Sequence, residues 1–482
     1  MLVASVTAFT AAAVAFVLAT DTGGAGLRFG LFVSIYLMIA YLFITRYKGP
    51  GSLDLFGPAP GLVVLLFLYS VASALYVESA GTTNYGDSVN ASVMSTYYIS
   101  CILGLAGISA GMLVAQRCEN FFNDGAIVRR FRIDNHTFFR KLILYGTAVA
   151  IAFFPFIYKS FDFTNVLSYA ERALPLRLEH MASATSGLSE FFLVILPVTL
   201  VLCTATLLMI RSRMLWIKLT GAAVLTAYIL TNTLAGWRGV VISAAAIPLV
   251  FYHYRVKRIS GTKAAIVIVL VYLFINGLSV VRFTSDPKQM WDAMRDEITY
   301  HGFEFAKLKS SGELLVGTNL MRLISGLEDG ETDFTYGSSV VTELLVFVPR
   351  AFYPNRPLPL SEKFVNVFYP HVYSSGGGYG FFILQEGYWS FGIVGVLIFM
   401  FIYGFSVQMV YQWFSKNMHH DCVGLLYSGI YVPLVLTAVR TGIIGTYKMA
   451  LMNVFPIMVI MLLPWKRWTR RTTSIPFILQ RK

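Results

Sequence analysis

Charged side chains are scarce in this chain, since Asp, Glu, Lys and Arg together make up 13% of its 482 residues. Soluble globular domains carry about a quarter, so the composition excludes an ordinary water-soluble protein. Cysteine is also scarce, and its four positions are widely spaced: Cys101, Cys118, Cys203 and Cys422. This spacing argues against a disulfide framework and fits no metal-binding motif. We therefore expect neither a structural disulfide nor a metal site.

Long apolar runs are what the chain has in abundance. A transmembrane helix needs about 20 mostly apolar residues. Twelve runs near this length occur, at about residues 3–20, 27–44, 61–77, 93–115, 142–158, 191–210, 219–236, 239–252, 264–280, 391–410, 422–439 and 449–465. The first run lacks a basic start and a small-residue cleavage site, so we expect a membrane helix there rather than a signal peptide. The sequence therefore predicts an all-α polytopic membrane protein with about 12 transmembrane helices.

The order of the runs divides the chain into three parts. Residues 1–280 hold helices 1–9, residues 281–388 form one long hydrophilic loop, and residues 389–482 hold helices 10–12 and a basic tail. Lys and Arg gather in alternate short loops, and basic loops resist translocation. We therefore expect both termini in the cytoplasm and the long loop outside. The formal net charge of +13 then reflects a basic rim against anionic lipid headgroups, and nucleic acid is not an expected partner.

The long outer loop has local structure of its own. Asp286 stands before a proline and is a good helix start, and apolar residues at helical spacing after it predict an amphipathic helix on the membrane surface. Two apolar patches follow, at 320–327 and 340–348, and the second is too short to cross a bilayer. The prolines of 349–359 indicate a rigid shelf, and the glycines Gly376–Gly378 a mobile flap. A plain linker is the alternative.

Arginines mark the outer ends of several predicted helices. Arg238, Arg282, Arg350 and Arg440 lie there, and Arg356 follows in the proline-rich turn of the outer loop. A guanidinium near hydrocarbon is unfavourable without a partner, and its planar fork binds two phosphate oxygens at once. We therefore expect a shared anionic ligand, with a lipid-linked diphosphate as the candidate. Simple anchoring at the interface is the alternative.

Candidate proton acceptors lie on the same side. Glu386 enters the tenth predicted helix among apolar neighbours, where burial would suit general acid–base chemistry. His371 in the flap is the second choice, and His301 and Glu343 are further options. The alternatives are a structural carboxylate at a helix start for Glu386 and a solvated loop histidine for His371.

Aromatic residues near these positions are candidate platforms for sugar rings. We name four of them as glycan-binding candidates: Tyr353, Tyr379, Tyr388 and Trp389. Tyrosine and tryptophan present a flat apolar face together with a polar group. The same residues also form ordinary aromatic belts at membrane interfaces, which is the alternative reading.

Four motifs in the second half of the chain carry a family resemblance. They are Gly-x-Arg-Gly at 236–239, Pro-Arg followed by Pro-x-Arg-Pro at 349–357, Glu-x-Tyr-x-x-Phe-Gly at 386–392, and Arg-x-Gly at 440–442. In this order, over roughly residues 230–445, they resemble the O-antigen polymerase family, the Wzy-type oligosaccharide repeat unit polymerases. Two positions depart from the family pattern. Gln385 stands where a glycine commonly precedes the glutamate, and Thr441 where a second glycine would follow the arginine.

The resemblance implies a membrane glycosyltransferase of the C-type architecture, active on the periplasmic face of a bacterial inner membrane without metal or other cofactor. The growing glycan would pass from its undecaprenyl-diphosphate carrier onto the non-reducing-end sugar of a new lipid-linked repeat unit. Such chemistry requires a cationic site for the diphosphate, a base for the attacking hydroxyl and a groove for the glycan. Lipid-linked oligosaccharides and the bilayer are the implied partners, and a chain-length-regulating membrane protein would be a further one.

Two other functions fit parts of the pattern. A lipid-linked glycan ligase would share the substrate chemistry. A secondary transporter or lipid flippase would share the helix number, but such transporters are commonly built from two repeated halves. Here the dominant loop is external and follows the ninth predicted helix, and we detect no internal repeat.

Overall fold

The computed structural model describes residues 25–47, 54, 56–118, 135–160, 196–234, 238–263, 289, 291–292, 295–296, 299, 314–345, 348, 353, 355, 357–374 and 377–462. Within these ranges the regular structure is helical, and the only pairing of extended backbone is at two isolated bridges, Thr82 with Ser88 and Phe381 with Thr441. The helices of the first half are α2 (Ala25–Arg46), α3 (Pro58–Ala80), α4 (Ala91–Arg117), α6 (Asn135–Ser160), α9 (Leu196–Arg211), α10 (Leu215–Leu234) and α11 (Arg238–Arg255).

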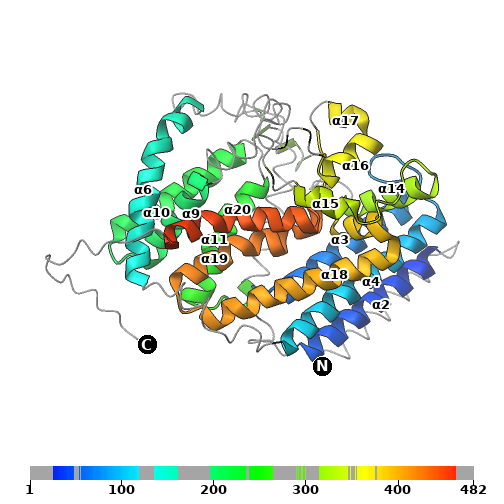
Figure 1. The fold of residues 1–482 in the computed structure, drawn as a ribbon, viewed down its shortest axis with the longest axis horizontal. Coiled ribbons are helices and arrows are strands. Elements are labelled where there is room, and N and C mark those ends of the chain that lie inside the picture. The colour runs from blue at the N-terminus through cyan, green and yellow to red at the C-terminus, as the bar shows by residue number, and fades with distance from the viewer. Residues whose placement is uncertain are drawn as a thin grey trace.

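The second half continues with shorter helices and then three long segments (Figure 1). The short helices are η4 (Leu314–Val316), α14 (Gly317–Glu328), α15 (Ser338–Leu345), α16 (Leu360–Phe368) and α17 (Pro370–Ser374). The long segments are α18 (Ile383–Asn417), α19 (Asp421–Tyr431) with its extensions η5 (Val432–Thr437) and η6 (Ala438–Arg440), and α20 (Ile443–Leu462).

Six helical segments in the described part are long and apolar enough to cross a membrane. They are Gly26–Arg46, Pro58–Ala80, Ala91–Arg117, Ile383–Asn417, Asp421–Arg440 and Ile443–Leu462. Helices α6, α9, α10 and α11 coincide with four more of the predicted apolar runs. The predicted runs at 3–20 and 264–280 lie outside the described residues. The chain is therefore a polytopic helical membrane protein, and the number of 12 spans stays a prediction.

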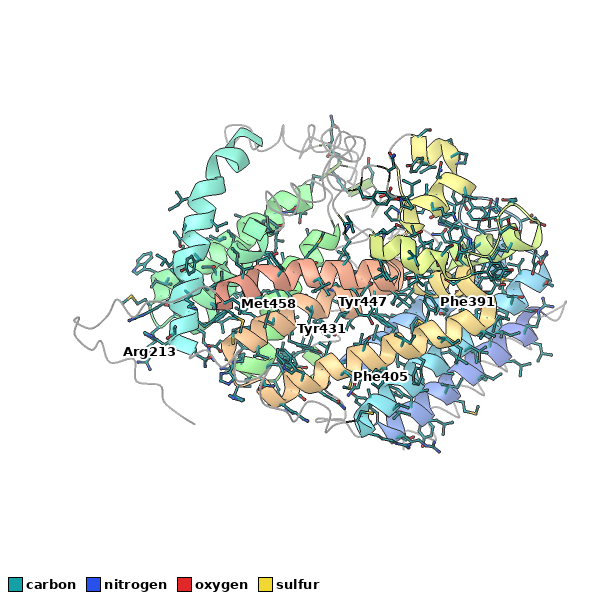
Figure 2. The ribbon with its side chains drawn as sticks, viewed as in Figure 1. Arg213, Phe391, Phe405, Tyr431, Tyr447 and Met458 are labelled. Carbon is teal, nitrogen blue, oxygen red and sulfur yellow. The ribbon has the colours of Figure 1, made fainter. Side chains whose placement is uncertain are left out.

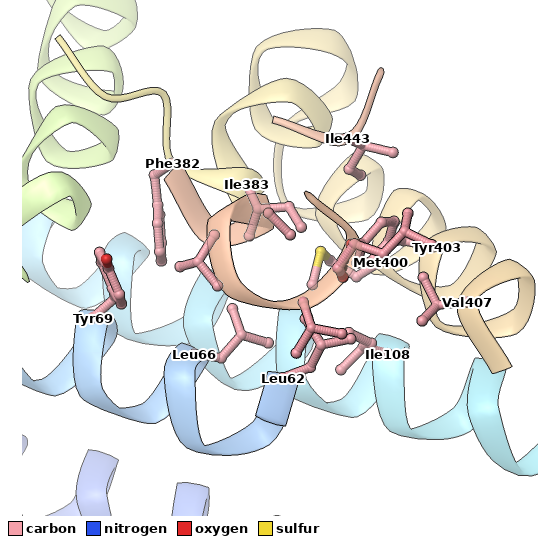
Figure 3. Close-up of a cluster of buried hydrophobic side chains, with 14 of the residues drawn as sticks. Leu62, Leu66, Tyr69, Ile108, Phe382, Ile383, Met400, Tyr403, Val407 and Ile443 are labelled. Atoms are coloured by element: carbon pink, nitrogen blue, oxygen red, sulfur yellow. Dashed lines mark hydrogen bonds between the residues drawn. The ribbon is translucent and has the colours of Figure 1, made fainter. Parts of the chain in front are cut away.

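The core forms where α3, α4 and α18 meet. Leu62 and Ile108 point toward Met400 and Tyr403 of α18 (Figure 3), and all four are fully buried. Helices α4 and α18 lie side by side along most of their length (Figure 1). A Cβ atom at Gly107 of α4 would stand 2.7 Å from a carbonyl oxygen of α18. Small residues thus permit this close approach, as is usual between membrane helices.

One end of the bundle, here named the basic end, collects loops that the sequence analysis places on the inner side. Arg211 of α9 and Arg255 of α11 both pair with Asp421 at the start of α19, at 2.5 and 2.7 Å. His253 lies 3.1 Å from Asp54, in the connection before α3. Burial alone would raise the pKa of Asp54, but hydrogen bonds, chiefly with His253, hold this pKa below its ordinary value.

The opposite end, here named the loop end, holds α14–α17 against the α3–α4 connection. Thr318 of α14 donates a hydrogen bond to Asn84 at 2.5 Å, and Ser73 of α3 donates to the carbonyl of Leu314 at 3.3 Å. Arg213 near the basic end and Phe391 at the loop end lie on opposite sides of the view in Figure 2. The two ends thus separate segments predicted to be inner from segments predicted to be outer. Which end faces the periplasm stays a prediction.

The long loop is largely helical where the structure describes it. The apolar patch at 320–327 lies in α14, and the patch at 340–348 overlaps α15 as far as Leu345. Of the helix predicted after Asp286, only scattered positions between 289 and 299 are described, and all of them are helical. Helices α16 and α17 were not anticipated, since residues 360–374 follow the proline-rich shelf. In α16 the buried residues Leu360, Phe364, Val365 and Phe368 recur at helical spacing, a signal that the sequence does carry.

Candidate functional site

Two of the sequence motifs, distant along the chain, meet at the loop end. The backbone N–H of Phe381, just before α18, donates to the carbonyl of Arg440 at 2.9 Å. The carboxylate of Glu386 accepts from the N–H groups of Ile443 and Ile444, at 2.7 and 3.3 Å. The Glu-x-Tyr-x-x-Phe-Gly and Arg-x-Gly motifs are therefore parts of one site, which lies where α18 and α20 both begin.

Glu386 caps the N-terminus of α20. The residue is 2% exposed, and its Oε2 atom accepts hydrogen bonds from the first free N–H groups of that helix. A carboxylate is stabilised there by the partial positive charge of the helix end. Glu386 is thus a structural carboxylate at a helix start, which was the alternative to a catalytic role. The helix that it caps is α20, however, and not α18, which carries it. Its role as the base stays a prediction.

The motif around Glu386 also breaks α18. Phe391 has φ −145° and ψ 26°, and Gly392 has φ 62° and ψ −147°, a conformation that is essentially restricted to glycine. The break leaves carbonyl groups of the short first part without helical partners. The N–H groups of Thr335 and Tyr336 satisfy the carbonyls of Trp389 and Ser390, at 2.9 and 3.1 Å. The turn before α15 therefore locks the first part of α18 in place.

The two departures from the family pattern have structural partners. Gln385 is fully buried. Its side chain accepts from the N–H of Phe382 at 2.5 Å and donates to the carbonyl of Asn319 on α14 at 3.1 Å. Thr441 donates to the carbonyl of Thr437 at 3.1 Å. Each polar side chain thus adds a bond that glycine could not make, and Gln385 ties the Glu386 segment directly to α14.

Arg440 is the only one of the five candidate diphosphate-binding arginines whose side chain lies in the described part. It is partly exposed, ends η6 and stands next to Thr441 and Gly442. Its charge lowers the pKa of the Tyr85 phenol, which burial raises, so the guanidinium lies near that ring. Arg238 begins α11, but its side chain is not described, and Arg282, Arg350 and Arg356 lie outside the described residues. A shared arginine cluster stays a prediction.

The other acid–base candidates are placed only in part. His371 is exposed on the short helix α17, where its carbonyl accepts from the Ser374 hydroxyl at 3.0 Å. Glu343 belongs to α15, but its side chain is not described, and His301 lies outside the described residues. The structure thus places His371 at the surface of the long loop and Glu386 in its buried base.

The four candidate glycan-binding aromatics differ sharply in exposure. Trp389 is fully buried, and its indole N–H donates to the carbonyl of Asp333 at 3.2 Å. Its ring therefore packs in the core and offers no face to a glycan in this conformation. Tyr388 is 7% exposed and Tyr353 is 41% exposed. Tyr379 is partly exposed and stacks on another tyrosine, Tyr85, with the ring centroids 4.1 Å apart.

Sequence reasoning missed Tyr85. It stands in the connection between α3 and α4 beside Gly86, which has φ 92°. Nothing in a turn of this kind identifies a partner almost 300 positions further along the chain. Only the packing of α3, α4 and α18 brings the ring to the site.

Comparison with known proteins yields one assignment. No curated protein and no solved structure matches the chain. The family model of the O-antigen polysaccharide polymerase Wzy matches residues 5–471, which is nearly the whole chain. The match includes all four motifs and also the first half of the chain, where the resemblance read from the sequence had no motif. The chain therefore belongs to the O-antigen polysaccharide polymerase Wzy family.

Proposed function

We propose that this protein polymerises undecaprenyl-diphosphate-linked oligosaccharide repeat units on the periplasmic face of the bacterial inner membrane, with both termini in the cytoplasm. Membership of the family supports a polymerase of lipid-linked repeat units in a membrane. The observation that carries the proposal is the meeting of Glu386 and the Arg440 segment at the loop end. A buried carboxylate is suited to accept a proton from a hydroxyl nucleophile, and a guanidinium is suited to bind a diphosphate leaving group.

The proposed reaction is a glycosyl transfer that balances without an oxidant or reductant. The acceptor hydroxyl at the non-reducing end of a new repeat unit loses its proton to the base. Its oxygen forms a bond to the anomeric carbon of the growing chain, and the bond from that carbon to the diphosphate oxygen breaks. The electron pair leaves with the lipid diphosphate. Arginines that spread the charge of the diphosphate make it a better leaving group, so we propose that no metal is needed.

Arg440 is the diphosphate contact that the described geometry supports best. Its side chain is partly exposed, and in the proposed orientation it would lie near the lipid headgroups. Its backbone carbonyl accepts a hydrogen bond from the N–H of Phe381. We propose Arg238, Arg282, Arg350 and Arg356 as further contacts on the basis of their positions in the sequence. Glu386 is the proposed base, with His371 as the second candidate.

The glycans made by a strain that lacks the protein test this function. Loss of long polymer, with a single repeat unit still attached to lipid, is the expected result. Purified protein in lipid nanodiscs should then lengthen lipid-linked repeat units without an added partner and in the presence of a chelator. Persistent polymer that no longer reaches its final acceptor would indicate a ligase instead. Repeat units that accumulate only on the cytoplasmic face would indicate a flippase.

A further inference from the structure

A pair of stacked tyrosines lies at the loop end, outside the membrane-spanning helices. Tyr85 belongs to the α3–α4 connection, and Tyr379 to the segment that precedes α18. Their ring centroids are 4.1 Å apart and their planes are inclined by 27°, and both residues are partly exposed. The ring of Tyr369 meets Tyr379 edge-on, at 4.9 Å and 86°. The rings of Tyr85 and Tyr379 thus form a partly exposed surface, with the buried ring of Tyr369 packed behind it.

A buried amide oxygen next to this surface lacks a partner. Asn319 of α14 is fully buried, and its amide nitrogen donates to the carbonyl of Gly380 at 2.6 Å. Its Oδ1 atom accepts no hydrogen bond from any residue that the structure describes. An unpaired acceptor in a buried position is unfavourable, and a hydroxyl group of a ligand is a donor that would satisfy it.

Asn319 and a positive charge both lie beside the Tyr85 phenol. Burial raises the pKa of that phenol, whereas the side chains of Asn84 and Asn319 and the charge of Arg440 act in the opposite direction. Gly380, which accepts from Asn319, directly follows Tyr379, and a Cβ atom on it would stand 3.7 Å from that of Arg440. The aromatic surface therefore adjoins the amide oxygen of Asn319 and the segment that carries Arg440.

We propose that Tyr85, Tyr379 and Asn319 form a subsite for a sugar ring of the lipid-linked glycan. The C–H face of a sugar packs on the exposed side of the tyrosine pair, and one of its hydroxyl groups donates to Oδ1 of Asn319. Arg440 then lies on the side that faces the diphosphate. This inference rests on the proposed function, and it adds Tyr85 and Asn319 to the residues that contact the substrate.

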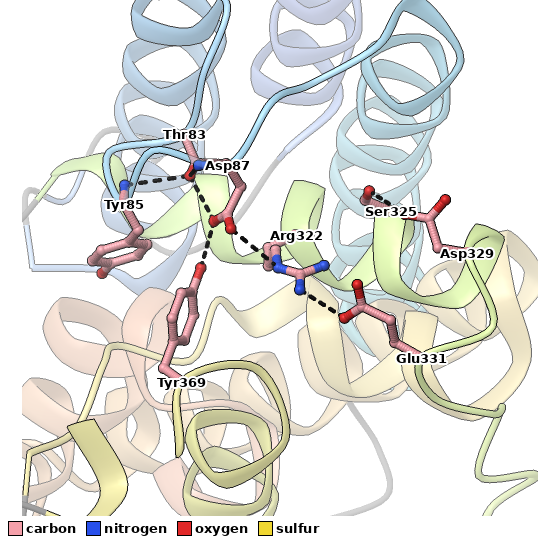
Figure 4. A network of polar contacts seen from close by, with 8 residues as sticks. All are labelled: Thr83, Tyr85, Asp87, Arg322, Ser325, Asp329, Glu331 and Tyr369. Atoms are coloured by element: carbon pink, nitrogen blue, oxygen red, sulfur yellow. Dashed lines mark hydrogen bonds and ion pairs between the residues drawn. The ribbon is translucent and has the colours of Figure 1, made fainter. Parts of the chain in front are cut away.

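The connection that carries Tyr85 is held rigidly, which favours binding by a preformed surface. Asp87 accepts hydrogen bonds from Thr83 at 2.9 Å and from Tyr369 at 2.8 Å, and Arg322 of α14 stands 3.4 Å from it (Figure 4). Tyr369 thereby links the connection to the end of α16. The network orders the α3–α4 connection against two helices of the long loop before any glycan arrives.

Binding of a free oligosaccharide tests the subsite separately from catalysis. The probe is the repeat-unit oligosaccharide released by mild acid from the lipid-linked form, titrated into full-length protein in nanodiscs by ligand-observed NMR. Tyr85→Ala and Tyr379→Ala should each weaken binding roughly tenfold, because each removes one aromatic face. Tyr85→Phe keeps the ring and should bind as the wild type does. Tyr252→Ala, which changes a 39% exposed tyrosine on α11, is the matched control and should have no effect.

The outcomes separate the subsite from the proposed function. Unchanged affinity in both Tyr85→Ala and Tyr379→Ala, with polymerisation intact, would overturn the subsite and leave the polymerase proposal standing. Failure of the wild-type protein to extend any lipid-linked repeat would instead overturn the polymerase proposal. Because Tyr379 is partly exposed, its alanine variant gives a second reading if Tyr85→Ala does not fold. Asn319→Leu, which removes the acceptor oxygen, should lose most of the affinity.

Discussion

At the scale of single residues, Glu386 has one observed role, as a helix cap, and one proposed role, as a base. Its Oε2 atom accepts from the first N–H groups of α20, and these bonds stabilise a carboxylate that is 2% exposed. Proton transfer from an acceptor hydroxyl is the proposed second role. Glutamine and alanine distinguish them, because glutamine still offers a carbonyl oxygen to the helix end and alanine offers none.

We expect Glu386→Gln to fold normally and to polymerise at least roughly a hundredfold more slowly, the low end of what the loss of a general base removes. Glu386→Ala should be equally slow and also less stable, by about 1 kcal/mol for the lost cap. Turnover of purified protein and its thermal unfolding measure the two effects. A near wild-type rate in Glu386→Gln, with loss of activity in His371→Ala, would transfer the base to His371.

At the scale of elements, the break in α18 positions the site. The short part Ile383–Ser390 carries Glu386 and Gln385, and it is held from outside by the N–H groups of Thr335 and Tyr336. In a straight helix the carbonyls of Trp389 and Ser390 would accept from N–H groups of α18 itself. The direction of Glu386 relative to α20 would also differ. We therefore expect the Phe-Gly that ends the sequence motif to be required for the break in α18.

Gly392 should tolerate no side chain. Its φ of 62° and ψ of −147° disfavour any residue with a Cβ atom by about 1–3 kcal/mol. We expect Gly392→Ala to lower the unfolding temperature and to reduce polymerisation together. Gly261→Ala is the control, since a Cβ atom there would meet nothing within 4 Å. Equal unfolding temperatures for Gly392→Ala and wild type would show that the break is not required.

At the scale of the whole molecule, the two ends of the bundle differ in composition and in contacts. The basic end is tied by ion pairs of Asp421 with Arg211 and Arg255. The loop end combines the ion pair of Arg322 and Asp87 with aromatic rings and the helices of the long loop. In the proposed function, the diphosphate of a lipid-linked substrate would bind at the loop end, beside Arg440.

Thiol labelling tests which end faces outward. Cysteine placed at Ser374, which is exposed on α17, should react with a membrane-impermeant reagent in intact cells. Cysteine placed at Arg213, exposed beyond α9, should react only after lysis, and the native Cys118 should behave in the same way. Labelling of the Arg213 position but not of the Ser374 position in intact cells would reverse the topology.

Most of the long helices, and their grouping at two ends, can be predicted from the amino-acid sequence. Apolar runs specify membrane helices because backbone groups in hydrocarbon must bond within their own segment, so ten of the twelve runs coincide with helices of the described part. The alternation of basic loops separated the same two sets of segments that the structure gathers at opposite ends. The motifs around Glu386 and Arg440 meet in the structure, and their role as a catalytic site stays a prediction.

The contacts that these residues make depend on how the helices pack. The cap of Glu386 on α20, the burial of Trp389 and the stack of Tyr85 on Tyr379 all join segments that are distant in sequence. Hydropathy describes how a single residue partitions between lipid and water. It therefore does not predict how one helix is rotated relative to another. That rotation follows from side-chain packing, such as the close approach at Gly107, and it selects which polar and aromatic groups meet at the loop end.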